Sequence, residues 1–291
     1  MMRTIRVLSR DSALAVRQAE LVTEAIEKYD PELRTKLITM KSTGDIILSR
    51  PLDEIGGKGL FVKELDDALI SGSGDISVHS CKDLPIVENP SLSLIAFSVR
   101  EDARDALILP RGAAELDAAK PVGCSSARRA VQLRALYPDI QIAPVRGNVP
   151  TRLEKLDGGE YSALVLAAAG LRRLGLTKRI TRLFEPWEML PAACQGIIAV
   201  QGRAGEEAEF LQLFRDEEAE ICARAERAFT AALGADCSSP VAAYAVRCGA
   251  GYKISGMVVD TEGRPHCDSV SADAETLADA ARELAERMRN E

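Results

Sequence analysis

Histidine is scarce in this chain and cysteines at metal-ligand spacing are missing, which argues against a zinc site. The 291 residues include two histidines and seven cysteines, and no two cysteines form a Cys-x-x-Cys pair. Structural zinc sites need clustered cysteine and histidine ligands, so the sequence predicts no metal site. An odd number of dispersed cysteines in a chain of this length is typical of reduced thiols, and we therefore expect a cytoplasmic protein.

Long apolar runs and an excess of positive charge are also missing. The most apolar stretch, residues 163–171, is far too short to cross a bilayer, and residues 1–10 hold no apolar run longer than two residues. The net charge of −7 argues against general nucleic-acid binding. We expect a soluble protein that binds neither membranes nor nucleic acids.

The charge is unevenly distributed along the chain. Residues 123–182 contain eleven lysines or arginines against four aspartates or glutamates, a local charge of +7, so the remainder carries −14. One basic segment in an acidic protein indicates a small anionic ligand rather than a polyanionic surface.

The order of apolar segments predicts an α/β protein of two or three domains. We expect two α/β domains joined by a hinge, at 1–99 with 197–216 and at 100–196, and a small α+β domain at 217–291. The second domain should contain a mainly parallel sheet. The expected strands cover 5–8, 37–40, 76–78, 92–97, 106–109, 121–123, 140–145, 163–166, 197–200, 241–246 and 253–259, with helices at 14–29, 61–69, 128–136, 151–156, 168–174 and 217–233 and from 275.

The apolar segment at 197–200 is expected to return to the first domain, because a helix follows it. Two crossings between the domains predict a two-lobed molecule with its ligand between the lobes.

Residues 75–85 form the stretch around which the chain is organised. The apolar run Ile76–Val78 ends in the polar cluster His79-Ser80-Cys81-Lys82-Asp83, and Pro85 prevents ordinary continuation of the strand. Open α/β sheets bind ligands at the carboxyl ends of their strands. Asp83 could stabilise a cation or relay protons there. Alternatively, Asp83 caps the next turn and Lys82 is solvated.

Arginines occupy several junctions between strands and helices, where guanidinium groups and helix N-termini suit carboxylates or phosphates. Each of them could instead be a solvated surface charge. Lys58, in a glycine-containing loop that lacks the phosphate-loop pattern, adds one cation. The junctions are Arg10 before the N-cap Ser12, Ser125-Ser126-Ala127-Arg128-Arg129, Arg146-Gly147-Asn148, and Arg172-Arg173.

Cys237 lies in a loop of small residues that ends at Pro240. An accessible loop thiol can serve as a nucleophile or an attachment point, although it can equally be an ordinary cysteine. Cys81, Cys124 and Cys194 also fall near the predicted crevice, and spacing does not choose among them.

Taken in order, these motifs resemble the hydroxymethylbilane synthase (porphobilinogen deaminase) family nearly end to end. The resemblance rests on residues 9–12, 56–61, 79–83, 125–129 and 146–149, on Leu190-Pro191 with Gln195-Gly196, and on Cys237 with Pro240. It implies two domains like those of periplasmic binding proteins, a third domain, and a monomer. It also implies a dipyrromethane cofactor joined by a thioether to Cys237. Porphobilinogen units would be added to the growing oligopyrrole chain with loss of ammonia, and a linear tetrapyrrole hydrolysed off.

The resemblance also implies roles for individual residues. Asp83 corresponds to the catalytic aspartate, and Ala235-Asp236 stands where the family usually has two glycines before the cofactor cysteine. The implied cofactor-binding residues are Cys237, Ser80, Lys82, Ser125, Ser126, Arg128, Arg129 and Arg146, and the implied substrate-binding residues are Arg10, Ser12, Gln18, Lys58, Arg146, Arg152 and Arg173.

A rival hypothesis is a two-lobed binding protein for an anionic metabolite, without chemistry. It explains the hinge and the arginines. It does not explain a carboxylate at the end of the central strand, the Cys237 loop or the third domain. The intact mass discriminates, since only the synthase should be heavier than its sequence by a dipyrromethane.

Overall fold

The computed structural model describes residues 4–41, 62–87, 89–206, 208–236 and 238–289. The chain forms two compact units, Met1–Arg100 with Ile197–Glu220, and Glu101–Gly196 with Ile221–Glu291. Each unit has its own sheets and is described by itself. Two residues singled out in the sequence, Lys58 and Cys237, lie outside the described residues, as does most of the glycine-containing loop around Lys58.

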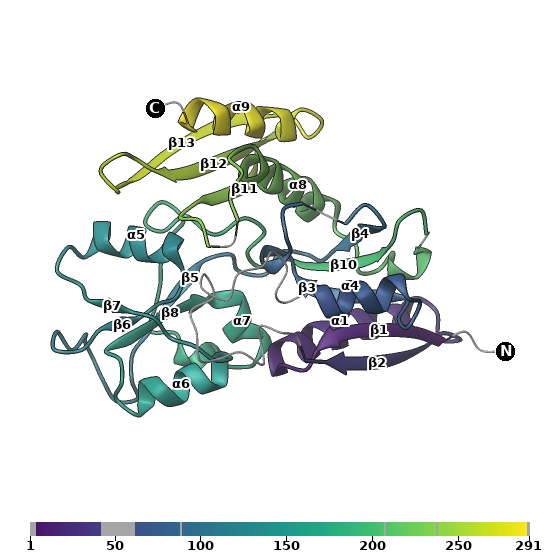
Figure 1. The fold of residues 1–291 in the computed structure, drawn as a ribbon, viewed down its shortest axis with the longest axis horizontal. Coiled ribbons are helices and arrows are strands. Elements are labelled where there is room, and N and C mark those ends of the chain that lie inside the picture. Colours follow the sequence, from purple (N-terminus) through teal and green to yellow (C-terminus); the bar gives the residue numbers. More distant parts are fainter. Residues whose placement is uncertain (1–3, 42–61, 88, 207, 237, 290–291) are drawn as a thin grey trace. The chain divides into compact units, whose positions relative to one another are not determined.

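The first unit is built on a five-stranded sheet in the order β2-β1-β3-β10-β4 (Figure 1). Strands β1, β2 and β3 are parallel, whereas β10 is antiparallel to both β3 and β4. The predicted return of the segment at 197–200 to the first sheet is thereby confirmed. The strands are β1 (Thr4–Arg10), β2 (Arg34–Met40), β3 (Ile76–Ser80), β4 (Leu92–Phe97) and β10 (Ile198–Arg203).

Helix α1 begins where the sequence predicts, because Ser12 caps it and accepts a hydrogen bond from the Ala15 amide. Its buried face consists of Gln18, Ala19, Val22 and Ile26. Tyr29 is 38% exposed, since it lies at the last helical position beside the C-cap. The helical segments of this unit are α1 (Ala13–Tyr29), α4 (Lys63–Ile70), and the 3₁₀ turns η1 (Cys81–Asp83) and η3 (Glu209–Leu211).

The larger sheet of the second unit has the order β7-β6-β8-β5-β9. Strand β6 is parallel to β7 and β8, but β5 is antiparallel to β8 and β9, so the prediction of a mainly parallel sheet is wrong for half of it. Strand β5 is the first strand of this unit, and its partners β8 and β9 come later in the chain. The strands are β5 (Asp105–Ile108), β6 (Val122–Gly123), β7 (Ile142–Ala143), β8 (Ala163–Ala167) and β9 (Arg182–Leu183).

Helices cover both faces of this sheet. Alternate residues of β5 enter two different cores: Ala106 and Ile108 pack with α6 and α7, and Leu107 packs with α5. The complete burial of β5, and of β8 except for its last residue, follows from this double cover. The helical segments are α5 (Ala127–Leu136), α6 (Val149–Asp157), α7 (Ala168–Arg173) and the 3₁₀ turn η2 (Thr177–Arg179).

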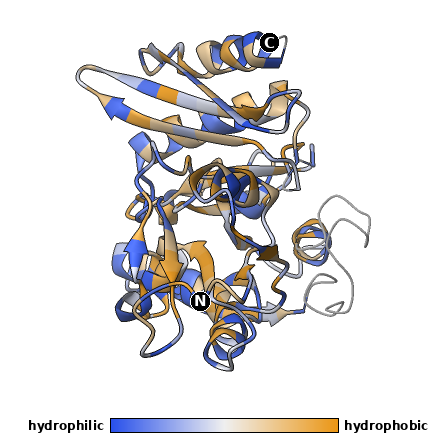
Figure 2. Cartoon of the chain, turned by 90° about the vertical axis from the view of Figure 1, so that its left-hand side faces the viewer, coloured by the Kyte–Doolittle hydropathy of each residue, from blue (hydrophilic) through white to orange (hydrophobic). Residues whose placement is uncertain are grey.

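A separate antiparallel sheet, β11-β12-β13, forms the C-terminal part of the second unit. Helices α8 and α9 share one core with it, and Figure 2 shows α9 carrying both hydrophobic and hydrophilic residues. Strand β13 was not expected, because its sequence is mostly polar. The elements are α8 (Glu217–Ala232), which begins in the first unit, β11 (Ala242–Cys248), β12 (Gly251–Val259), β13 (Pro265–Ala272) and α9 (Leu277–Arg289).

The predicted fold class is confirmed: two sheet-plus-helix α/β domains and a small α+β domain at the C-terminus. Throughout the described ranges, the helices fall short of the length and apolar character that crossing a membrane requires.

Candidate functional site

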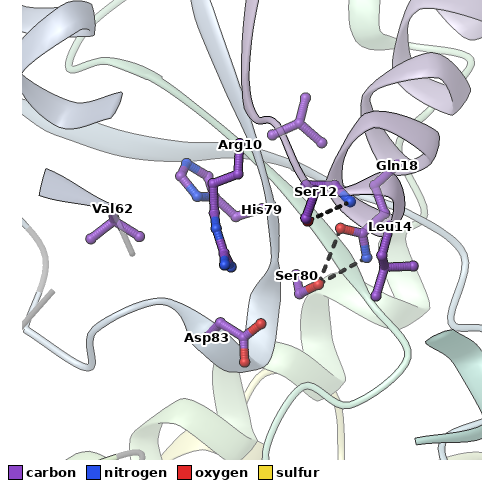
Figure 3. Close-up of a pocket in the computed structure, with 10 residues that line it drawn as sticks. Arg10, Ser12, Leu14, Gln18, Val62, His79, Ser80 and Asp83 are labelled. Atoms are coloured by element: carbon purple, nitrogen blue, oxygen red, sulfur yellow. Dashed lines mark hydrogen bonds between the residues drawn. The ribbon is translucent and has the colours of Figure 1, made fainter. Parts of the chain in front are cut away.

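A pocket lies in the first unit at the carboxyl ends of β1 and β3. These strands are parallel neighbours, so the residues that follow them meet at one edge of the sheet, where α/β folds bind ligands. Figure 3 shows the side chain of Arg10 extending into this pocket toward Asp83. The lining residues are Arg10, Ser12, Leu14, Ala15, Gln18, Val62, Val78, His79, Ser80 and Asp83.

Asp83 is held at the pocket by the single 3₁₀ turn η1, which follows β3 directly. The turn is anchored at its start, where the Cys81 amide donates to the Ile197 carbonyl at 3.0 Å, and closed where the Leu84 amide donates to the Cys81 carbonyl. Asp83 is exposed, and its carboxylate lines the pocket. This orientation favours a ligand-facing carboxylate over the alternative of a turn cap.

Gln18 links the first helix to the end of β3. Its amide nitrogen donates to the Ser80 hydroxyl at 2.8 Å (Figure 3), and the Gln18 side chain is almost completely buried. Gln18 and Ser80 therefore fix the position of α1 relative to the strand that leads to Asp83.

His79 forms part of a buried polar network beneath the pocket. Its Nε2 lies 2.7 Å from the Ser77 hydroxyl, which in turn donates to the Gln201 side chain at 3.3 Å. Burial lowers the pKa of His79 from 6.5 to about 4, and the charge of Arg10 acts in the same direction. The imidazole is therefore neutral at physiological pH.

We expect NMR titration to give His79 a pKa of about 4. Because the pKa in the folded state is below that in the unfolded chain, the contribution of His79 to stability is complete above pH 6.5 and is lost as the pH falls toward 4. The only other histidine is His266, so His266→Gln leaves a single imidazole signal to follow. Titration of that signal near pH 6.5 would contradict a buried neutral ring.

In the second unit, the parallel strands β6 and β7 end at two of the predicted basic junctions. Ser125 joins two of these junctions, because its hydroxyl donates to the Val145 carbonyl at 2.7 Å and accepts from the Val145 amide at 2.8 Å. Ser126 caps α5, and its hydroxyl accepts from the Arg129 amide at 3.4 Å. The arrangement places the start of α5 beside the segment that leads to Arg146.

Basic groups surround the start of α6. Asn148 caps this helix, Arg152 donates through Nε to the Gly147 carbonyl at 2.7 Å, and Lys155 donates to the Arg146 carbonyl at 3.4 Å. Gly147 has a φ of +110°, and an added Cβ would lie 2.9 Å from the Thr151 side chain. The turn therefore requires glycine, and it holds the half-buried Arg146 and Arg152 at the same helix N-terminus.

Arg128 and Arg129 are not on a solvated face. Their side chains are 4% and 9% exposed, and both pair with the carboxylate of Asp105, which is completely buried. The sequence did not predict a role for Asp105. The signal in the sequence that points to a buried charge is an aspartate directly before the apolar run at 106–109.

Arg172 and Arg173, which end α7, behave differently from each other. Arg172 is exposed and pairs with Asp102 at 2.8 Å. Arg173 donates to the Gly196 carbonyl at 2.6 Å, and burial lowers its pKa to about 10. Only Arg173 is therefore held inward.

Asp236 organises the loop before Pro240. Its Oδ1 accepts hydrogen bonds from the amides of Ser238 and Ser239, at 3.0 and 3.1 Å, and from their hydroxyls. These bonds, led by the one from the Ser238 hydroxyl, lower the pKa of Asp236.

Two family models match the chain. The model described as "Porphobilinogen deaminase, dipyromethane cofactor binding domain" matches residues 5–210, and "Porphobilinogen deaminase, C-terminal domain" matches residues 220–290.

Curated relatives agree over nearly the whole length. The porphobilinogen deaminase of Alkaliphilus oremlandii is 51% identical over 99% of this chain and 97% of its own. That of Acetivibrio thermocellus is 54% identical over 89% of each chain, and that of Burkholderia pseudomallei is 44% identical over 95% of this chain and 86% of its own.

Among solved structures, the periplasmic aliphatic sulphonate binding protein SsuA from Escherichia coli aligns over 99% of this chain and 88% of its own. It is 14% identical with a TM-score of 0.44, a likeness too weak to carry an argument.

Proposed function

Because the chain belongs to the porphobilinogen deaminase family, we propose how its own residues carry out the reaction of that family. The protein is a transferase, a hydroxymethylbilane synthase, that joins four porphobilinogen units head to tail with loss of ammonia and releases the linear tetrapyrrole by hydrolysis. When bound, the dipyrromethane cofactor supplies the covalently held primer for this chain. The rival hypothesis of a binding protein without chemistry is not favoured.

The observation that carries the assignment of the reacting centre is the position of Asp83. Its carboxylate lies at the carboxyl end of the central strand β3, in the same pocket as Arg10 and Ser12. In such a pocket the cationic and hydroxyl groups can hold an anionic substrate, while the carboxylate acts on the reacting carbon.

Asp83 has two roles in the proposal. When the carbon–nitrogen bond of porphobilinogen breaks, the electron pair leaves with ammonia, and the ionised Asp83 stabilises the cationic methylene group that remains. After the new carbon–carbon bond has formed, Asp83 accepts the proton from the pyrrole α-carbon and passes it to solvent. Arg10 must therefore bind substrate without neutralising Asp83 completely.

The carboxylates of substrate and cofactor account for the basic residues. Each porphobilinogen carries an acetate and a propionate, so a dipyrromethane carries four carboxylates. Guanidinium groups and capped helix N-termini are donors that suit this charge. We assign cofactor binding to Ser80, Lys82, Ser125, Ser126, Arg128, Arg129 and Arg146, and substrate binding to Arg10, Ser12, Gln18, Lys58, Arg146, Arg152 and Arg173.

Replacing Arg146 with lysine tests this assignment. The half-buried guanidinium should bind a carboxylate through two parallel hydrogen bonds, which an ammonium group does not reproduce. We expect kcat/KM for porphobilinogen to fall by about 10-fold or more, as for the loss of a charge-assisted hydrogen bond. Arg134→Lys, at an exposed position near the end of α5, is the control. Wild-type kinetics for Arg146→Lys would show that Arg146 is a surface charge and does not bind substrate through its guanidinium group.

Further parts of the proposal concern the whole molecule. We assign the covalent attachment of the cofactor to Cys237. We divide the chain into three domains, which comprise residues 1–99 with 197–216, residues 100–196, and residues 217–291. The six described cysteines are free thiols, which supports a reducing, cytoplasmic setting. The enzyme is proposed to act as a monomer, with porphobilinogen and the growing oligopyrrole as its only partners.

A further inference from the structure

The carboxylate of Asp105 lies between two consecutive arginines. Asp105 begins β5 and is completely buried. Its Oδ2 lies 2.8 Å from Nη2 of Arg128, and its Oδ1 lies 2.7 Å from Nη2 and 2.9 Å from Nε of Arg129. Although burial alone would raise the pKa of Asp105, the two guanidinium groups hold it well below its ordinary value, so the carboxylate is ionised.

Gln195 adds a third residue to this cluster. Its amide nitrogen donates to Asp105 Oδ1 at 2.9 Å and to the Ala103 carbonyl at 2.6 Å, and its side chain is completely buried. Three segments that are far apart in the sequence, at 103–105, 128–129 and 195, therefore meet at one carboxylate.

The arginines are also fixed at their outer nitrogens. Arg128 donates through Nη1 to the Leu190 carbonyl at 2.6 Å, and Arg129 donates through Nη1 to the Val165 carbonyl at 3.2 Å. A guanidinium group has five N–H donors in a rigid plane, so bonds to some of them fix the orientation of the whole group. Long, flexible arginine side chains are thereby held in one orientation before any ligand arrives.

We propose that Asp105 is a positioning residue, which orients Arg128 and Arg129 to receive carboxylates without itself touching a ligand. The inference rests on the proposed role of these two arginines in binding the cofactor. The orientation of Arg128 and Arg129, and not only their charge, then depends on Asp105, about two dozen residues earlier in the chain.

Asp105→Asn tests the inference. Asparagine keeps the shape but turns either a neutral oxygen or an N–H group toward the arginines, so their orientation is lost. We expect the fraction of purified protein that carries the dipyrromethane mass to fall by about 10-fold or more, because misplacement by about 1 Å costs binding groups most of their effect. In the loaded fraction, KM for porphobilinogen should rise while kcat changes little, since the Asp83 carboxylate is untouched. Asp105→Glu, which keeps the charge, should restore part of the loading.

A double-mutant cycle separates positioning from simple stability. If Asp105 acts through Arg128 and Arg129, the loss of loading caused by Asp105→Asn should be smaller in the Arg129→Gln background than in the wild-type protein. Additive losses of loading in the double variant would contradict the inference.

Asp157→Asn is the matched control. Asp157 also holds two arginines in the same unit, Arg179 at 2.8 Å and Arg111 at 3.2 Å, but it lies at the last position of α6, away from the basic junctions. Its replacement should lower the thermal midpoint and leave both cofactor loading and KM unchanged.

The results distinguish this inference from the proposed function. A folded, fully loaded Asp105→Asn protein with the wild-type KM overturns the role of Asp105. If Asp105→Asn does not fold, Gln195→Met serves instead, because it removes one hydrogen bond to the same carboxylate without unpairing a charge. It should also lower loading, and wild-type loading would overturn the inference. Wild-type loading and KM in both Arg128→Gln and Arg129→Gln would instead refute the role of the arginines.

Discussion

Asp83→Asn is expected to slow porphobilinogen turnover by on the order of 10²- to 10⁴-fold, the usual contribution of a positioned proton acceptor. Asparagine keeps the size of the side chain but removes its charge and its ability to accept a proton. Loss of electrostatic stabilisation of the cationic methylene group would enlarge the effect. Steady-state kcat, measured on protein whose cofactor loading has been verified by mass, checks this result.

The fold should survive this substitution, because Asp83 is exposed and lies in a single 3₁₀ turn. Mass spectra should therefore show enzyme complexes that elongate very slowly. Asp83→Glu keeps the charge but moves it by one methylene, and its rate should fall between those of asparagine and aspartate. Asp67→Asn, at an exposed position on α4, is the control. Near-wild-type turnover by a folded, loaded Asp83→Asn enzyme would remove Asp83 from the mechanism.

Cys237→Ser is expected to abolish covalent cofactor attachment and, with it, chain assembly. A thiolate is a strong nucleophile at neutral pH, whereas a serine hydroxyl is not without an activating base. The intact mass of the variant should equal that of its sequence, and porphobilinogen consumption should fall below detection.

Peptide mapping of the wild-type protein should place the added mass on Cys237 alone. Cys248→Ser, which removes an exposed thiol from the end of β11, should keep both the adduct and the activity. An adduct on Cys81, Cys124 or Cys194, or active enzyme without any adduct, would show that the attachment site is elsewhere.

Local signals in the sequence were sufficient to predict the helix and strand that line the pocket of the first unit. Ser12 predicts the start of α1 because its hydroxyl caps the helix, and the apolar run before His79 predicts the strand that delivers Asp83. Both depend on interactions within a few residues, which the sequence shows directly.

Contacts between residues that are distant in the sequence could not be predicted in the same way. The burial of Arg128 and Arg129 depends on Asp105, which is distant in sequence, so the residues around the two arginines do not reveal it. The antiparallel direction of β5 also leaves no mark on its own residues, because a strand covered on both faces is apolar whichever way it runs.

The position of β10 has a consequence for how the protein is made. Strand β10 lies between β3 and β4, but residues 101–196 are translated before it. At roughly 5–20 residues per second, the ribosome needs on the order of 5–20 s to make these roughly 100 residues, and during that time β3 and β4 lack their shared partner. Unpaired strand edges promote association with other chains. Nascent chains that stall within this interval are therefore the ones most exposed to aggregation, and they depend most on the chaperones that meet them at the ribosome.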